Sequence, residues 1–204
     1  MTATPFDPAN FVIPPIIKRN TILFALAQSF SGAGMQFAYG LGPLMVLALT
    51  GSAALAGLSV GLIGLSRFLA SYPVGKITDA YGRKPGIVFG LTLALIGGLI
   101  CGSSMYFASI WVFIIGMTIF GMGMSGVQQL RVAATDMYPH FHRAQALGYL
   151  ALGSLVGLIF SPLIIGGSEK FAHANGYNPL SVPWFILPVL ILTARDQWHE
   201  KVAG

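Results

Sequence analysis

The stretch Gly75-Lys-Ile-Thr-Asp-Ala-Tyr-Gly-Arg-Lys84 places one carboxylate, two glycines and three cations within ten residues. The segments on both sides of it are long and nearly uncharged. Charged residues form 8% of the 204-residue chain and hydrophobic residues 55%, whereas a soluble domain carries about 25% charged residues. So few charges cannot cover a water-facing surface of this size. We therefore predict an all-α membrane protein, in which this stretch connects two spanning helices.

The remaining composition excludes several other classes. The pI is about 9.6, but the cations are too few and too dispersed for nucleic-acid binding. The single cysteine, Cys101, lies in an apolar run and allows no intramolecular disulfide. Residues 1–20 hold no hydrophobic region ahead of a small-residue cleavage site, so we expect the first spanning helix to direct insertion.

Six segments are expected to span the membrane, a role that needs roughly 20 mostly apolar residues. They are residues 21–50, 53–74, 86–107, 110–135, 144–167 and 180–194. The last is short and holds Pro183 and Pro188; it would extend about 22 Å, against a hydrocarbon core of roughly 30 Å. The expected organisation is an N-terminal segment 1–20, a six-helix domain 21–194 and a tail 195–204.

The distribution of Lys and Arg predicts the orientation of these segments. One side of the membrane would hold Lys170, and the other would hold Lys18, Arg19, Lys76, Arg83, Lys84, Arg143, Arg195 and Lys201. Because positive charge accumulates on the cytoplasmic side, both termini are expected there. This arrangement requires an even number of spans and predicts a multi-pass protein of the cytoplasmic (inner) membrane.

The charged stretch has content that membrane orientation alone does not require. Gly75 and Gly82 permit tight turns or close backbone contact. Asp79 and Arg83 are four residues apart, so a helical turn would pair them. Pro85 suits the first turn of the following helix. We therefore expect a short rigid connection with a fixed carboxylate.

The pattern Gly-x-x-x-Asp-x-x-Gly-Arg-Lys between the second and third expected helices resembles the signature loop of the major facilitator superfamily. Residues 67–75 (RFLASYPVG) resemble the second helix of that family. A second match follows the fourth expected helix, at Arg131, Asp136, Pro139, Arg143 and Ala146. The resemblance covers about residues 20–194, the N-terminal half of such a transporter. The alternative is that the two charged loops are unrelated.

The resemblance implies a fold, a function and roles for residues. It implies one half of a transporter, a 3+3 inverted repeat of six helices, that moves a small solute by alternating access with a second six-helix half from the same or another chain. It further implies that Asp79 and Arg83 help to lock the outward-open state by meeting that other half, with Gly75, Gly82 and Lys84 in the same latch. Arg131, Asp136 and Arg143 are then candidates for a cytoplasmic charge network.

The sequence departs from the family at several points. The chain is shorter than a complete member, and Met117 stands where some members carry an arginine four residues before Gly121. The fifth expected helix has a motif close to the antiporter signature, in which a serine replaces a glycine and the final glycine pair is displaced: Gly148, Gly157, Ser161, Pro162 and Gly166. No acidic residue lies within an expected span to carry a proton. These departures weaken the interpretation as a proton-driven drug antiporter and leave both secondary-active and facilitative transport open.

Candidate solute contacts lie on the first and fourth expected helices. Gln28, Gln36 and Tyr39 fall within an arc of about 80° at 100° per residue, and Ser125 and Gln129 share one face. These side chains either line the transport path of an uncharged or amphipathic solute or form hydrogen bonds between helices.

The small-xxx-small pairs predict where helix backbones approach closely. They are Gly57/Gly61 and Gly153/Gly157.

Two other functions remain open. The run Gly123-Met-Ser-Gly126 resembles the nucleophile motif of rhomboid intramembrane proteases, but no histidine lies in an expected span to serve as its base. A half-transporter could also act as a membrane scaffold or assembly partner without transporting. The sequence has no dinucleotide fingerprint, Walker loop or metal-ligand cluster, so we expect no cofactor and no enzyme activity.

Overall fold

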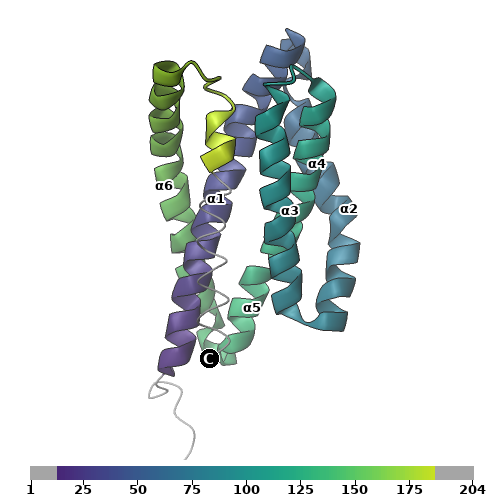
Figure 1. The fold of residues 1–204 in the computed structure, drawn as a ribbon. Coiled ribbons are helices and arrows are strands. Elements are labelled where there is room, and N and C mark those ends of the chain that lie inside the picture. Colours follow the sequence, from purple (N-terminus) through teal and green to yellow (C-terminus); the bar gives the residue numbers. More distant parts are fainter. Residues whose placement is uncertain (1–12, 187–204) are drawn as a thin grey trace, which may run out of the picture.

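The computed structural model describes residues 13–186, except the side chain of Lys84, and within them the chain is helical without strands. Figure 1 shows the helices packed side by side as an elongated bundle. The elements are α1 Pro15–Thr50, η2 Ala53–Leu55, α2 Leu58–Tyr81, α3 Arg83–Ser104, α4 Ile110–Val127, α5 Gln129–Met137, η3 His140–His142 and α6 Arg143–Asn175. The predicted all-α fold is confirmed.

Five stretches are long and apolar enough to cross a membrane. They are Pro15–Thr50, Ala53–Tyr81, Pro85–Ser104, Ile110–Met137 and His140–Asn175. These correspond to the first five predicted spans. Most of the sixth, at 180–194, lies outside the described residues, although residues 182–186 are helical.

Some helices are longer than the apolar segments from which we predicted them. The charged stretch is mostly helical, because α2 continues through it to Tyr81 and ends only at Gly82. Likewise, α6 runs to Asn175 rather than to residue 167 and ends at Gly176. Hydropathy marks where the hydrocarbon core ends, but a helix ends where the backbone must leave helical geometry. Both ends here occur at a glycine with positive φ.

Gly82 has φ +87° and ψ 172°, a combination that is essentially restricted to glycine. Gly82→Ala is therefore expected to lower the free energy of unfolding by about 1–3 kcal/mol. Gly75→Ala is the matched control, since Gly75 is helical and an added Cβ would meet nothing within 4 Å. Thermal unfolding in detergent measures both, and unchanged stability of Gly82→Ala would show that the turn does not need this backbone conformation.

Glycines bring α3 and α4 into backbone contact. A Cβ added to Gly90 would lie 2.6 Å from the Cα of Gly126, and one added to Gly116 would lie 2.7 Å from the backbone nitrogen of Cys101. These distances leave no room for a side chain. Helices in lipid associate through such close packing, because no hydrophobic force drives them together.

The contact between α1 and α6 has the same origin. A Cβ on Gly153 or Gly157 would collide with the carbonyl oxygen of Ala25 or Ser29, respectively. The Ser29 hydroxyl also donates a 2.6 Å hydrogen bond to the carbonyl of Gly153. The prediction of close approach is therefore confirmed for Gly153 and Gly157.

The corresponding prediction for Gly57 and Gly61 is wrong for the described part of the chain. A Cβ added to either glycine would meet nothing within 4 Å. A small-xxx-small pattern shows where a backbone can be approached, but it does not show that another helix lies opposite. Gly57, which precedes α2, and Gly61 in its first turn are both exposed.

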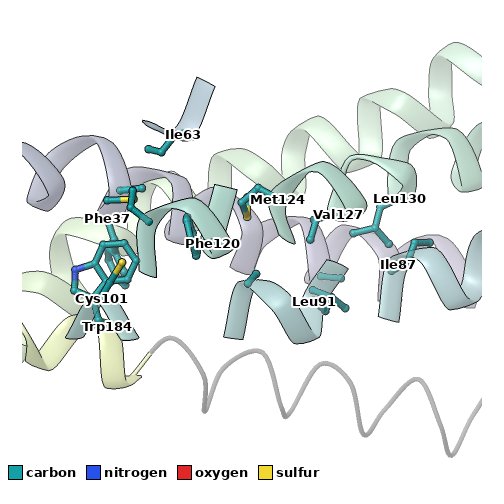
Figure 2. Packing of buried hydrophobic residues seen from close by; sticks show 14 of the residues in the cluster. Phe37, Ile63, Ile87, Leu91, Cys101, Phe120, Met124, Val127, Leu130 and Trp184 are labelled. Atoms are coloured by element: carbon teal, nitrogen blue, oxygen red, sulfur yellow. The ribbon is translucent and has the colours of Figure 1, made fainter. Parts of the chain in front are cut away.

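Large apolar side chains fill the space between the helices (Figure 2). Trp184, which follows α6 in the chain, is fully buried in this core, beside Cys101 in Figure 2. Its ring meets Phe120 edge-on at 5.4 Å between centroids, and its Nε1 donates to the sulfur of Met45 at 3.1 Å. Trp184 thus ties the segment after α6 back to α1 and α4.

Candidate functional site

The two charged stretches predicted from sequence lie at the same end of the bundle. Figure 1 shows the α2–α3 turn and α5 at this end, where α1 and α6 also begin. Lys170 follows almost thirty residues into α6, toward the opposite end. The uneven distribution of cations along the sequence is therefore an asymmetry between the two ends of the bundle.

Arg83 joins the two stretches. Its Nε lies 2.5 Å from Oδ2 of Asp136 in α5, and the exposed fractions of the two side chains are 39% and 49%. One terminal nitrogen of Arg83 also donates to Oε1 of Gln129 at 3.4 Å. An arginine that meets a carboxylate and an amide is held in one orientation. The ion pair thus connects the start of α3 to α5.

Asp79 is placed differently from the prediction. The expected pair with Arg83 does not form, because the backbone leaves helical geometry at Gly82 and the two residues do not share a helix. Asp79 is exposed near the end of α2, and it forms no ion pair with the described side chains, which do not include that of Lys84.

The other latch and network residues lie in α2, α3, α5 and α6. Gly75 lies inside α2, and Lys84 is the second residue of α3. Arg131 in α5 and Arg143 at the start of α6 are exposed, and neither forms an ion pair with another described residue. Of the predicted network residues, Asp136 is the one that forms an ion pair among the described side chains.

The ion pair is expected to contribute little to stability. Both of its side chains are about half exposed, and exposed ion pairs contribute about 0–1 kcal/mol. A double-mutant cycle of Arg83→Gln and Asp136→Asn, measured by unfolding in detergent, should therefore give a coupling energy below about 1 kcal/mol. A coupling of about 3 kcal/mol, as in a buried pair, would contradict this and indicate that the pair holds the fold together.

The candidate solute contacts divide into two groups. Ser125 donates a 3.2 Å hydrogen bond to the carbonyl of Arg67 in α2, and Gln129 accepts from Arg83. These two side chains make contacts between helices, which was the alternative interpretation of them. Gln36 is half-buried and Tyr39 is exposed.

Gln28 has a different environment. It is 4% exposed, and its Oε1 has no hydrogen-bond partner among the described residues. Ser161 in α6 is also fully buried, and its hydroxyl also lacks such a partner. Buried polar atoms without partners are costly, so each of these two atoms calls for an explanation such as an ordered water or a bound solute.

The other members of the helix-five motif are less constrained. Gly148 and Gly166 have open space where a side chain would stand, and Pro162 is exposed within α6. Only Gly157 and Ser161 face the interior.

One buried contact gave no signal in the sequence. The hydroxyl groups of Thr21 and Tyr138 form a 2.8 Å hydrogen bond across 117 residues. It ties α1 to the chain just after α5. A threonine and a tyrosine so far apart show no pattern that predicts this contact.

The geometry does not support the protease interpretation. The described histidines, at 140, 142 and 173, lie in η3 and in the last turn of α6. The hydroxyl of Ser125 points to the backbone of α2 instead.

Comparison with known proteins shows which proteins resemble this chain, its two charged stretches included. A sequence model of the Major Facilitator Superfamily matches residues 24–194. An uncharacterized MFS-type transporter of Bacillus subtilis strain 168, YdeG, is 26% identical over 88% of this chain and 42% of its own length. The riboflavin transporter RfnT of Brucella anthropi is 28% identical over 72% of this chain and 37% of its own length. The inner membrane transport protein YajR of Escherichia coli K12 is 32% identical over 63% of this chain and 27% of its own length. The chain thus spans less than half the length of these relatives.

Proposed function

Because the chain belongs to the Major Facilitator Superfamily, we propose that it takes part in the transport of a small solute by alternating access. It forms one wall of the solute path, and a second six-helix half forms the other. The observation that carries this proposal is the Arg83–Asp136 ion pair, which joins both signature stretches and leaves Asp79 exposed beside them.

In this proposal the charged end is a conformational latch. Asp136 and Gln129 hold Arg83, so the α2–α3 turn is fixed relative to α5. The carboxylate of Asp79 then meets a donor on the second half when the solute path is closed at this end. Breaking that contact releases the two halves to rock apart. The latch shifts a balance between two states, which differ by only a few kcal/mol in such proteins.

The orientation follows from the same charges. Cations gather at the end where α1 and α6 begin, and positively charged connections remain in the cytoplasm. Both termini are therefore assigned to the cytoplasmic side of the inner membrane. The sixth span that the sequence predicts at 180–194 would return the chain to that side.

For the substrate we propose a chemical class and not a single compound. Gln28 offers a buried acceptor without a partner, and Ser161 offers a buried hydroxyl. Neither carries charge, so the path suits an uncharged or amphipathic solute with hydrogen-bonding groups. The relative from Brucella anthropi is named a riboflavin transporter. Riboflavin is an uncharged, amphipathic compound with hydrogen-bonding groups, so it is the first compound to test.

The experiment compares this chain alone with this chain plus a second six-helix half, each in proteoliposomes. Riboflavin and a panel of neutral and amphipathic solutes are offered, and uptake is measured. Uptake of a solute only when both halves are present would support the proposal. Correct insertion of both halves without uptake of any solute would contradict it and favour the scaffold interpretation.

Before that experiment, the mass of the protein in its native membranes should be measured with an antibody against residues 1–20. A band near 21.6 kDa would show that the second half comes from another copy or another chain. A band about twice as large would show that both halves belong to one polypeptide.

A further inference from the structure

Arg67 is a cation in the middle of a membrane-spanning segment. It stands fourteen residues after Ala53 and fourteen before Tyr81, the two ends of the second span. At 1.5 Å per residue it is about 21 Å from either end, and half of a hydrocarbon core is about 15 Å thick. An arginine near a helix end can extend to the membrane surface, but Arg67 is too far from both ends to do so. The transport proposal gives this residue no role.

The described part of the chain offers no counter-ion to Arg67. Its guanidinium forms neither an ion pair nor a hydrogen bond with the described residues. Asp79 is twelve residues further along α2, and Glu169 lies near the far end of α6. Asp136 is paired with Arg83. Arginine is always charged, and a charge inside the membrane is costly without a partner or water, so Arg67 needs an anion from elsewhere.

Arg67 lies on the inner face of α2. At 100° per residue it is within about 60° of Ile63, Ala70 and Val74, which are all buried. Its carbonyl accepts the hydrogen bond from Ser125 of α4. The residue itself is only half-buried, so part of it can be reached from outside this half.

The outward face of α2 has a different character. Four large side chains near Arg67 in the sequence are more than half exposed: Leu65, Phe68, Leu69 and Tyr72. They lie about 100–160° away from Arg67 around the helix, and none of them is charged. This face therefore offers a second half mainly apolar contacts, whereas Arg67 is turned toward α4. A solute is for this reason a better counter-ion than a side chain of the second half.

The depth of Arg67 follows from the contact between α1 and α2, which run in opposite directions. A Cβ added to Gly42 of α1 would lie 3.1 Å from the Cβ of Ser59 of α2, so these two residues are level. Arg67 is eight residues beyond Ser59 toward the charged end of the bundle. It is therefore about level with Gly34 of α1.

Ser161 of α6 lies in the same layer of the bundle. Because α1 and α6 both begin at the charged end and Gly157 contacts Ser29, Ser161 is about level with Ala33, one turn further on. Its hydroxyl also lacks a partner among the described residues. Two polar groups without partners thus share the middle of the bundle, and the substrates of such transporters bind near the bilayer midplane.

We propose that Arg67 binds an anionic group, a carboxylate or a phosphate, of the transported solute. This inference rests on the proposed transport function and narrows it: the solute is amphipathic and carries an anionic group. The planar guanidinium donates two parallel hydrogen bonds to that group. Gln28 and Ser161 then bind its uncharged part.

The test offers matched neutral and anionic solutes to proteoliposomes that contain both halves. Riboflavin with riboflavin 5′-phosphate is the first pair, and nicotinamide with nicotinate is the second. We expect the anionic member of at least one pair to be taken up faster than the neutral member. Arg67→Gln should lower its uptake about tenfold or more, the effect of losing a charge-assisted contact. Arg67→Lys should retain part of the rate, because it keeps the charge.

Lys170→Gln is the control for the loss of one positive charge, because Lys170 is an exposed cation far along α6. It should leave the uptake of both solutes unchanged. An equal loss of neutral and anionic uptake in Arg67→Gln would overturn the inference and assign Arg67 to a contact with the second half. Faster uptake of neutral solutes that Arg67→Gln does not alter would also overturn it, while the transport proposal would stand.

A second measurement separates this inference from the transport proposal. Thermal unfolding of the chain alone in detergent is followed with each of the same solutes. An anionic solute should raise the unfolding temperature of the parent and of Lys170→Gln, but not that of Arg67→Gln. This result without uptake of any solute would contradict transport and still support the anion site. Absence of a shift that depends on Arg67, or lower stability of Arg67→Gln without solute, would contradict the anion site.

Discussion

Replacing Gly157 by leucine is expected to separate α1 from α6 and to lower the free energy of unfolding by about 3 kcal/mol or more. A Cβ at this position would already overlap the carbonyl oxygen of Ser29. The obstacle is backbone on a long helix, which cannot rotate away as a side chain can. The helices must move apart, and the hydrogen bond from Ser29 to Gly153 is lost with them.

Gly148→Leu provides the control on the same helix. An added Cβ at Gly148 meets nothing within 4 Å, and leucine is a better helix former than glycine by up to about 1 kcal/mol. This variant should be as stable as the parent or more stable. Unfolding in detergent, followed by circular dichroism and by the fluorescence of Trp184, measures both. Equal stability of the two variants would show that the α1–α6 contact adapts to a side chain.

The two glycine pairs show the limit of sequence reasoning about packing. Gly57/Gly61 and Gly153/Gly157 have the same spacing and similar apolar neighbours. Only the second pair meets another helix in the described part of the chain. The spacing predicts a smooth helix face, whereas the partner is decided by the arrangement of the whole bundle. The first five spans, in contrast, were predictable because hydropathy is a property of each segment alone.

The charged site was also only partly predictable from the sequence. Both stretches were recognisable in the sequence, and their shared location follows from the number of spans between them. The partner of Arg83 was not predictable, because it depends on a single backbone conformation. Helical spacing favours Asp79, but the positive φ of Gly82 turns Arg83 toward Asp136 instead. The sequence alone could have identified Gly82 as a residue at which the helix ends. It could not show whether Asp79 or Asp136 forms the ion pair with Arg83.

Asp79→Asn is expected to lower transport at least tenfold without changing the amount or the stability of the protein in the membrane. Asp79 is exposed and forms no ion pair with the described side chains, so we expect its loss not to affect the fold of this half. Hydrogen bonds to a charged group contribute about 1.5–3 kcal/mol, and a tenfold change corresponds to about 1.4 kcal/mol. Losing one such contact to the second half is therefore sufficient for the expected effect.

The measurement compares initial uptake rates in proteoliposomes that contain both halves, with protein content and thermal unfolding measured on the same samples. Asp79→Glu should recover part of the rate, because it restores the charge at a slightly different reach. Glu169→Gln is the control: Glu169 is an exposed carboxylate far along α6, and its partner is His173 at 3.9 Å. Normal uptake by Asp79→Asn would show that this carboxylate does not act as a latch. Lower uptake with lower stability would instead assign it a structural role, which its exposed position does not predict.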